Sequence, residues 1–251
     1  IKKDENVSLS AQTIRNFLHM NQYKACVPRK KPFISKKNIK QRLDYATKYV
    51  NKTDDYWKTV IFTDESKFNI FGSDGRRFVW RKENTALQAK NLKATVKHGG
   101  GSVMVWGAMT AGGVGNLVFV ETTMDKFYYL NILKENLKES ATKLGIENDF
   151  RFLHDNDPKH TSMVVRECLL YNVKEVIPHP PQSPDLNPIE HLWDILEKKI
   201  RQHTITNKQM LKDVIVEEWR NIGTGITQKL ALSIKNRLRE VIAAKGHHTR
   251  Y

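Results

Sequence analysis

The chain has 251 residues, 39% of them hydrophobic, and carries a formal net charge of +15 with an isoelectric point of about 9.7. Its length allows one sizeable domain or two small ones, and the absence of an apolar run of about 18 residues excludes a membrane-spanning helix. A chain this basic favours an anionic partner, of which nucleic acid is the commonest.

The basic residues are concentrated at the start of the chain. Residues 1–53 hold 13 Lys and Arg against 3 Asp and Glu, a net charge of +10. Such a block can be a solvated surface, but it fits better a segment that neutralises DNA phosphates and releases counterions. The two cysteines, Cys26 and Cys168, lie far apart and outside any C-x-x-C pair, which favours a reducing compartment and argues against a zinc ribbon.

The first predicted element is an amphipathic helix over 7–23. Ser10 suits its N-cap, and apolar residues recur after it with helical spacing. The pattern fits a plain amphipathic helix as well as the last helix of a helix-turn-helix. Residues 28–57 then form a basic linker that passes into a basic helix, and the run at 29–31 resembles a nuclear localisation patch.

From about residue 58 the pattern changes to strands and helices in alternation. Runs of β-branched and aromatic residues predict strands at 59–71, 76–81, 102–110, 116–121, 150–155 and 174–178. Helical periodicity predicts helices at 126–144, 161–172, 189–203, 207–221 and 227–244. This order is typical of an α/β fold with a mixed sheet flanked by helices.

Two aspartates end strands of this predicted sheet. Asp64 ends "VIFTD" and Asp155 ends "RFLHD", and strand ends present side chains into a crevice. Two carboxylates about 4 Å apart would repel by roughly 4 kcal/mol at an effective dielectric near 20, so a proton or a cation must accompany them, and Mg²⁺ prefers such oxygen ligands. Spacing alone leaves Glu65 as an alternative to Asp64 and Asp157 as an alternative to Asp155, and ordinary surface acids explain the pattern too.

A third acid, Glu190, stands near the start of the helix that follows a Pro-rich loop. Asn187 suits the N-cap of this helix and Pro188 its first position. Asn-x-x-Glu is also a capping-box pattern that needs no chemistry. Because Glu190 lies beside the apolar stripe of the helix, it can instead point along the rim toward the sheet, with Asp194 and Glu197 as alternatives one and two turns on.

Four motifs occur in order along the chain: "TDES", "GGGSVMVWGAM", "HDNDPKHT" and "SPDLNPIEHLW". Together with the 34 residues between Asp155 and Glu190, they resemble the catalytic core of mariner-superfamily DNA transposases of the Tc-type branch. The resemblance covers essentially the whole chain, because "RKKPFISKKNIKQRL" is similar to the linker of that family and "AAKGHHTRY" to its carboxyl end. The first helix-turn-helix of the family and most of the second have no counterpart here.

The resemblance implies a domain organisation. Residues 1–27 would be the remnant of the second helix-turn-helix and 28–57 the basic linker. A ribonuclease-H-like catalytic domain, similar to that of retroviral integrases, would cover 58–205 and carry a clamp-like insertion within 72–100. Helices over 206–251 would pack on this core.

The resemblance also implies a reaction and its residues. Asp64, Asp155 and Glu190 would form a DDE triad that binds two Mg²⁺ or Mn²⁺ ions, whereas Asp157 matches a framework position. The implied activity is cut-and-paste transposition, in which a nuclear homodimer hydrolyses DNA at the terminal inverted repeats and joins the 3′-hydroxyls to a TA target. A domesticated DNA-binding protein without catalysis, or a nuclease of the same fold without strand transfer, are the alternatives.

Contacts with the DNA backbone are expected from basic residues outside the triad. The candidates are Arg15, Arg29, Lys30, Lys31, Lys36, Lys37, Lys40, Arg42, Lys93 and Lys97. Three histidines, His154, His160 and His179, would either contact phosphate or support the metal ligands, or would be ordinary polar residues near the site.

Overall fold

The computed structural model describes residues 10–26, 33–70, 82, 83, 85, 88 and 101–251. The chain divides into two units, Ile1–Phe33 and Ile34–Tyr251. In the first unit, α1 (Ala11–Met20) begins at the predicted N-cap, since the Ser10 hydroxyl accepts a hydrogen bond from the Thr13 amide at 3.0 Å. The apolar residues of α1 are exposed within this unit.

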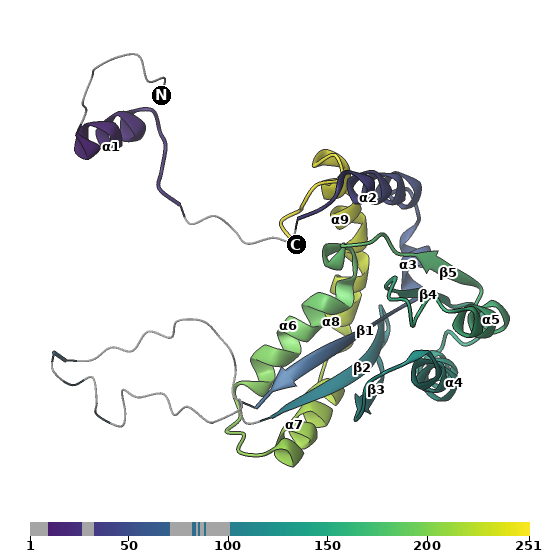
Figure 1. Ribbon diagram of the computed structural model, residues 1–251. Helices are drawn as coiled ribbons and strands as arrows, with labels where there is room; N and C mark the ends of the chain where they lie inside the picture. The colour runs from purple at the N-terminus through teal and green to yellow at the C-terminus, as the bar shows by residue number, and fades with distance from the viewer. Residues whose placement is uncertain (1–9, 27–32, 71–81, 84, 86–87, 89–100) are drawn as a thin grey trace. The chain divides into compact units, whose positions relative to one another are not determined.

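The second unit is built on a mixed sheet of five strands in the order β3-β2-β1-β4-β5 (Figure 1). Their bounds are β1 (Val60–Asn69), β2 (Ser102–Thr110), β3 (Gly113–Val120), β4 (Arg151–His154) and β5 (Glu175–Pro178). The central strand β1 pairs antiparallel with β2 and parallel with β4, which confirms the predicted mixed sheet. The strand predicted at 76–81 lies outside the described residues, as does most of the insertion predicted within 72–100.

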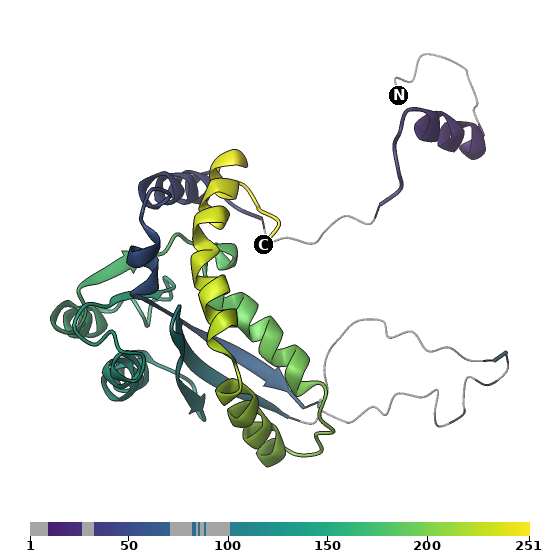
Figure 2. The same ribbon diagram turned by 180° about the vertical axis from the view of Figure 1, so that it is seen from behind.

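Helices cover both faces of this sheet (Figures 1 and 2). One face carries α4 (Lys126–Lys143) and α5 (Met163–Asn172), and the other carries α6 (Pro188–Ile200), α7 (Lys208–Arg220) and α8 (Thr224–Leu232). Successive residues of a strand point to opposite faces. Ile61 therefore joins the core under α4 and α5, whereas Phe62 joins the core under α6 and α7.

The predicted linker is, from Ile34 onward, part of the second unit. It forms α2 (Lys36–Tyr49) and α3 (Asp54–Lys58). Tyr49 and Trp57 of these helices are buried in the core on the α6 side of the sheet. The burial of these two aromatic side chains attaches the segment to the rest of the second unit.

The last helix predicted from the sequence, over 227–244, is two helices, α8 and α9 (Ile234–Ala243). They meet at Ser233, whose hydroxyl donates to the Leu230 carbonyl at 2.6 Å and so competes with the helical backbone ladder. Both cysteines are free thiols. Among the described residues, no helix is long and apolar enough to cross a membrane.

Candidate active site

Three elements bring the three predicted acids to one cavity. The prediction that Asp64 ends its strand is wrong: Asp64 lies within β1, because the pairing of β1 with β2 continues to Asn69. Asp155 directly follows β4, and Glu190 lies in the first turn of α6. Phe62 pairs with Leu153 across β1 and β4, and this register, continued by two residues, aligns Asp64 with Asp155. All three acids line a cavity of about 330 Å³, whose other walls are residues 156, 157, 179–184 and 187.

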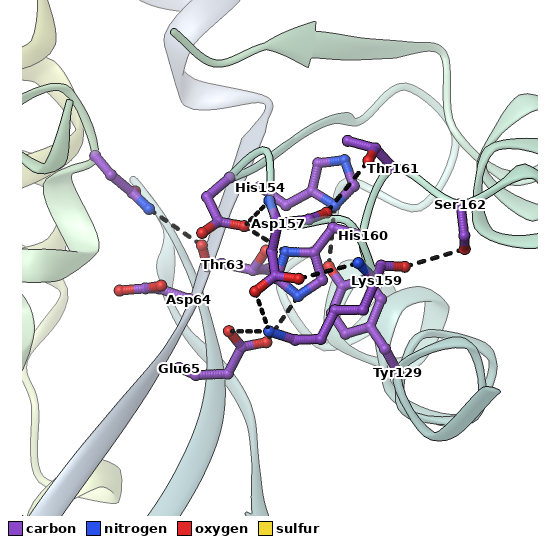
Figure 3. A network of polar contacts seen from close by, with 12 residues as sticks. Thr63, Asp64, Glu65, Tyr129, His154, Asp157, Lys159, His160, Thr161 and Ser162 are labelled. Carbon is purple, nitrogen blue, oxygen red and sulfur yellow. Dashed lines mark hydrogen bonds and ion pairs between the residues drawn. The ribbon is translucent and has the colours of Figure 1, made fainter. Parts of the chain in front are cut away.

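The alternation of side chains along β1 separates Asp64 from its neighbour Glu65. Asp64 faces α6, where its Oδ2 accepts a hydrogen bond from the Trp193 indole at 3.3 Å. Glu65 faces α4 and lines a different cavity (Figure 3). The two acids that the sequence left as alternatives are therefore on opposite faces of the sheet, and Asp64 is the one that shares a cavity with Glu190.

The capping box that could have occupied Glu190 is not formed. The Asn187 side chain makes no cap hydrogen bond to α6 and instead donates to the Thr63 carbonyl at 3.1 Å. The Asn187 amide, which Glu190 would accept from in a capping box, donates to the Pro184 carbonyl at 3.0 Å. Of the two alternatives, Asp194 is exposed and Glu197 pairs with Arg201 at 2.6 Å.

The surroundings of the cavity raise the pKa of two of the acids and lower that of the third. Burial first, and then the charge of Glu190, raise the pKa of Asp64 well above its ordinary value. Burial, Asp194 and Asp155 raise the pKa of Glu190. Burial also opposes the charge of Asp155, but hydrogen bonds from His160 and from the Asp157 amide outweigh it and lower its pKa to about 2.

The hydrogen bond from His160 that lowers the pKa of Asp155 belongs to a polar network on the α4 side of β1. The buried imidazole of His160 contacts Asp155 Oδ1 through Nδ1 and Glu65 Oε1 through Nε2, the latter at 3.0 Å. Lys159 lies beside them, with Nζ 3.8 Å from Glu65 Oε2 and 2.8 Å from Asp157 Oδ2 (Figure 3). Burial works to lower the pKa of His160, but its bonds to Asp155 and Glu65 raise it to about 9, so the ring is cationic at neutral pH.

The other two histidines are neutral at that pH. His154 is buried, with Nδ1 3.1 Å from the Tyr129 hydroxyl, and burial lowers its pKa to about 3. His179 lines the cavity, and burial lowers its pKa to about 4. The sequence analysis did not identify Trp193 as a partner of Asp64. The spacing could have indicated it, because Trp193 lies three residues after Glu190 and so on the same face of α6.

The donor chemistry of the cavity fits a hard divalent cation. Carboxylate oxygens are the ligands that Mg²⁺ prefers, and a cation would offset the two effects that raise the pKa of Asp64, its burial and the charge of Glu190. The Asn187 Oδ1 oxygen is buried without a hydrogen-bond partner beside these acids. In the described part of the chain, however, no three His, Cys, Asp or Glu side chains are grouped so that they could hold an ion together.

The basic residues predicted to contact DNA fall into three groups. The exposed ones in the described ranges are Arg15, Lys36, Lys37 and Lys40. Outside the described residues lie Arg29, Lys30, Lys31, Lys93 and Lys97. The prediction is wrong for Arg42, which is fully buried and donates to both carboxylate oxygens of Asp185 at 2.7 Å. Its positive charge is therefore paired inside the protein and does not face DNA.

Comparisons with known proteins agree with this geometry. Two family models match the chain, one described as "Transposase" over residues 1–51 and one as "DDE superfamily endonuclease" over residues 59–212. The transposable element Tc1 transposase of Caenorhabditis elegans is 39% identical over 242 residues, which are 96% of this chain and 88% of that protein. The Tcb2 transposase of Caenorhabditis briggsae is 36% identical over 251 residues, 100% of this chain and 92% of that protein.

Solved structures confirm the predicted ribonuclease-H-like fold class. The "Mos1 transposase paired-end complex with left transposon end" matches with a TM-score of 0.83 and 20% identity, over 96% of this chain and 72% of that one. The "Crystal structure of the mariner Mos1 paired end complex with Mg" matches with the same TM-score, identity and coverage.

Proposed function

From the premise that this chain belongs to the Tc1/mariner family of transposases, we propose that Asp64, Asp155 and Glu190 are its catalytic triad. The family sets the reaction class, cut-and-paste transposition by a DDE-type endonuclease that cleaves DNA and transfers strands. One observation carries the assignment of the triad: acids from β1, from the end of β4 and from α6 line a single cavity.

The three carboxylates would hold two divalent cations, Mg²⁺ or Mn²⁺. A cation held there would lower the pKa of an attacking water or 3′-hydroxyl and would neutralise charge at the scissile phosphate. The residues of the chain prepare this site before DNA arrives. Trp193 donates to Asp64, His160 holds Asp155, and Asn187 ties the start of α6 to β1 through the Thr63 carbonyl, which fixes Glu190 relative to Asp64.

The substrates we propose are the double-stranded terminal inverted repeats of a transposon and a TA target, engaged by a homodimer in the nucleus. The concentration of positive charge in residues 1–53 supports binding of the DNA backbone. Exposed Lys36, Lys37 and Lys40 on α2 are candidates for phosphate contacts, and Arg15 on α1 is a further candidate.

The triad is tested by Asp155→Asn. This variant keeps the size of the side chain but loses the charge of the carboxylate, so it should abolish cleavage of a transposon end in Mg²⁺ and leave DNA affinity near that of wild type. Asp194→Asn is the matched control, since this exposed acid stands one turn after Glu190 and should retain cleavage. Cleavage by Asp155→Asn at the wild-type rate would remove Asp155 from the mechanism.

The whole reaction is tested with pre-cleaved transposon ends, a target plasmid and Mg²⁺. Joined products at TA sites support transposition. Nicks without joining would instead support a nuclease of the same fold, and binding with neither product would support a DNA-binding protein without catalysis.

A further inference from the structure

Glu65 is an acid beside the catalytic strand position that the proposed triad does not use. It directly follows Asp64, and because neighbouring residues of a strand point to opposite faces, it cannot join Asp64 in the cavity. Its side chain is nevertheless largely buried, with 16% exposed. An ionised acid in such a position is retained at a cost unless it is paired and hydrogen-bonded, so its partners indicate its role.

The main partner of Glu65 is the ring of His160, which links it to Asp155. Nε2 lies 3.0 Å from Glu65 Oε1, and Nδ1 contacts Asp155 Oδ1. Ionised carboxylates only accept hydrogen bonds, so both ring nitrogens donate, one to each acid. The two hydrogen bonds then fix the orientation of the ring, so the position of Glu65 affects the position of Asp155.

The ring itself is held firmly in place. His160 is 2% exposed. Its ring centroid lies 3.9 Å from that of Tyr129 and 5.5 Å from that of His154, the latter nearly parallel at 19°. Packing at this density resists reorientation of a side chain. The ring can therefore transmit the position of one carboxylate to the other.

Asp155, by contrast, needs such support. It follows the last residue of β4, and its side chain is 48% exposed. Besides the contact with His160, its Oδ1 accepts from the Asp157 amide at 3.0 Å. Fixing a half-exposed side chain at a strand end costs conformational entropy. A hydrogen bond from a rigid, buried donor orders the side chain before a cation binds, so less of that entropy is lost on binding.

We propose that Glu65 is a positioning residue for Asp155 and acts through His160. The pair of consecutive acids in "TDES" would then have two roles, with Asp64 in the cavity and Glu65 behind it on the opposite face of the sheet. Lys159, 3.8 Å from Glu65 Oε2, balances the charge of Glu65. This inference rests on the proposed function, since it assumes that the position of Asp155 matters for cation binding and for cleavage.

The first test measures cation binding without DNA, from the electron paramagnetic resonance signal of free Mn²⁺. Removal of a hydrogen-bond partner of a metal ligand costs about 10- to 100-fold in affinity. Glu65 contacts that partner, His160, and not Asp155 itself, so Glu65→Ala should weaken Mn²⁺ binding by the lower figure, about tenfold. Glu65→Gln, which keeps an acceptor oxygen for His160, should lose less. Glu121→Gln is the charge control, because Glu121 lines the same cavity as Glu65 and pairs with Lys208 and Lys212 instead; its affinity should equal that of wild type.

The second test asks whether Glu65 works through the ring. If it does, Glu65→Ala should have little further effect in a His160→Gln background, because the link is already broken. On transposon ends, Glu65→Ala should lower kcat with KM for DNA unchanged. Because Glu65→Ala removes one of the two acceptors of the buried His160 ring, the urea midpoint should fall as well. A merely structural role would lower the midpoint but leave kcat and Mn²⁺ affinity of the folded variant at the wild-type values.

The proposal is overturned by wild-type Mn²⁺ affinity in Glu65→Ala, or by the same tenfold loss in the presence and absence of His160. Asp155→Asn, measured in parallel, separates this result from failure of the proposed function. If Asp155→Asn is inactive while Glu65→Ala behaves as wild type, only the positioning role is wrong. If Asp155→Asn cleaves DNA normally, the triad itself is wrong, and the role of Glu65 falls with it.

Discussion

The burial of Arg42 makes a prediction that separates a structural arginine from a DNA-binding one. Its side chain is 1% exposed and that of Asp185 10%. Besides both oxygens of Asp185, the guanidinium donates to Ser183 Oγ at 2.8 Å and to the Gly246 carbonyl at 2.9 Å. It thus joins α2 to the loop that walls the active-site cavity and to the end of the chain.

Arg42→Met keeps an apolar stem of similar length and removes every one of these hydrogen bonds. Removal of one partner of a buried ion pair costs about 3–5 kcal/mol, because the other charge stays buried and uncompensated. We expect Arg42→Met to lower the free energy of unfolding by that amount. Arg42→Met/Asp185→Leu should recover part of the loss, since it removes the stranded carboxylate as well.

The assay is urea unfolding followed by tryptophan fluorescence, with Lys40→Met as the matched control. Lys40 lies two residues earlier on α2 and is exposed, so its removal should change stability by no more than about 0.5 kcal/mol. In duplex DNA binding we expect the opposite, with the larger effect from Lys40→Met. Lys40→Met should reduce the salt slope by about 1, whereas folded Arg42→Met should bind as wild type. A stability loss below about 1 kcal/mol for Arg42→Met, or a reduced salt slope, would refute this reasoning.

Three further predictions concern the core, acid stability and DNA affinity. A Cβ at Gly107 would lie 2.6 Å from Trp193 Cη2, so Gly107→Ala should cost about 1–3 kcal/mol by overpacking; an unchanged urea midpoint would contradict this. Burial works to raise the pKa of Asp185, but Arg42 lowers it below its ordinary 3.8, so its contribution to stability is present above pH 3.8 and is lost as the pH falls through the lower folded value. Wild type should therefore lose unfolding free energy more steeply than Asp185→Asn below that pH, and parallel profiles would argue against the pair. If about six phosphates are neutralised, log K against log salt should slope near −5 on duplex DNA, and a flat response would mean that the basic block does not touch the backbone.

The order of strands and helices from β1 onward and the place of Asp155 at the end of β4 could be predicted from the sequence, whereas Asp64 lies within β1 and not at its end. These features depend on periodicity and turn residues within a few positions of one another, which a single sequence displays directly. The N-cap Ser10 was correct for the same reason. Asn187 did begin α6, but local pattern could not tell whether its side chain would cap the helix or reach across to β1.

Which side chains meet, and which charges are buried, was decided only by the tertiary structure. Arg42 has the local appearance of a DNA contact, and its partner Asp185 is 143 residues away. Glu65 and Asp64 are adjacent in the chain, yet one meets His160 and the other Trp193. Burial and pairing depend on contacts between segments that are remote in the chain. These contacts form only when the helices pack on the two faces of the sheet, so the spacing of residues along the sequence does not show them.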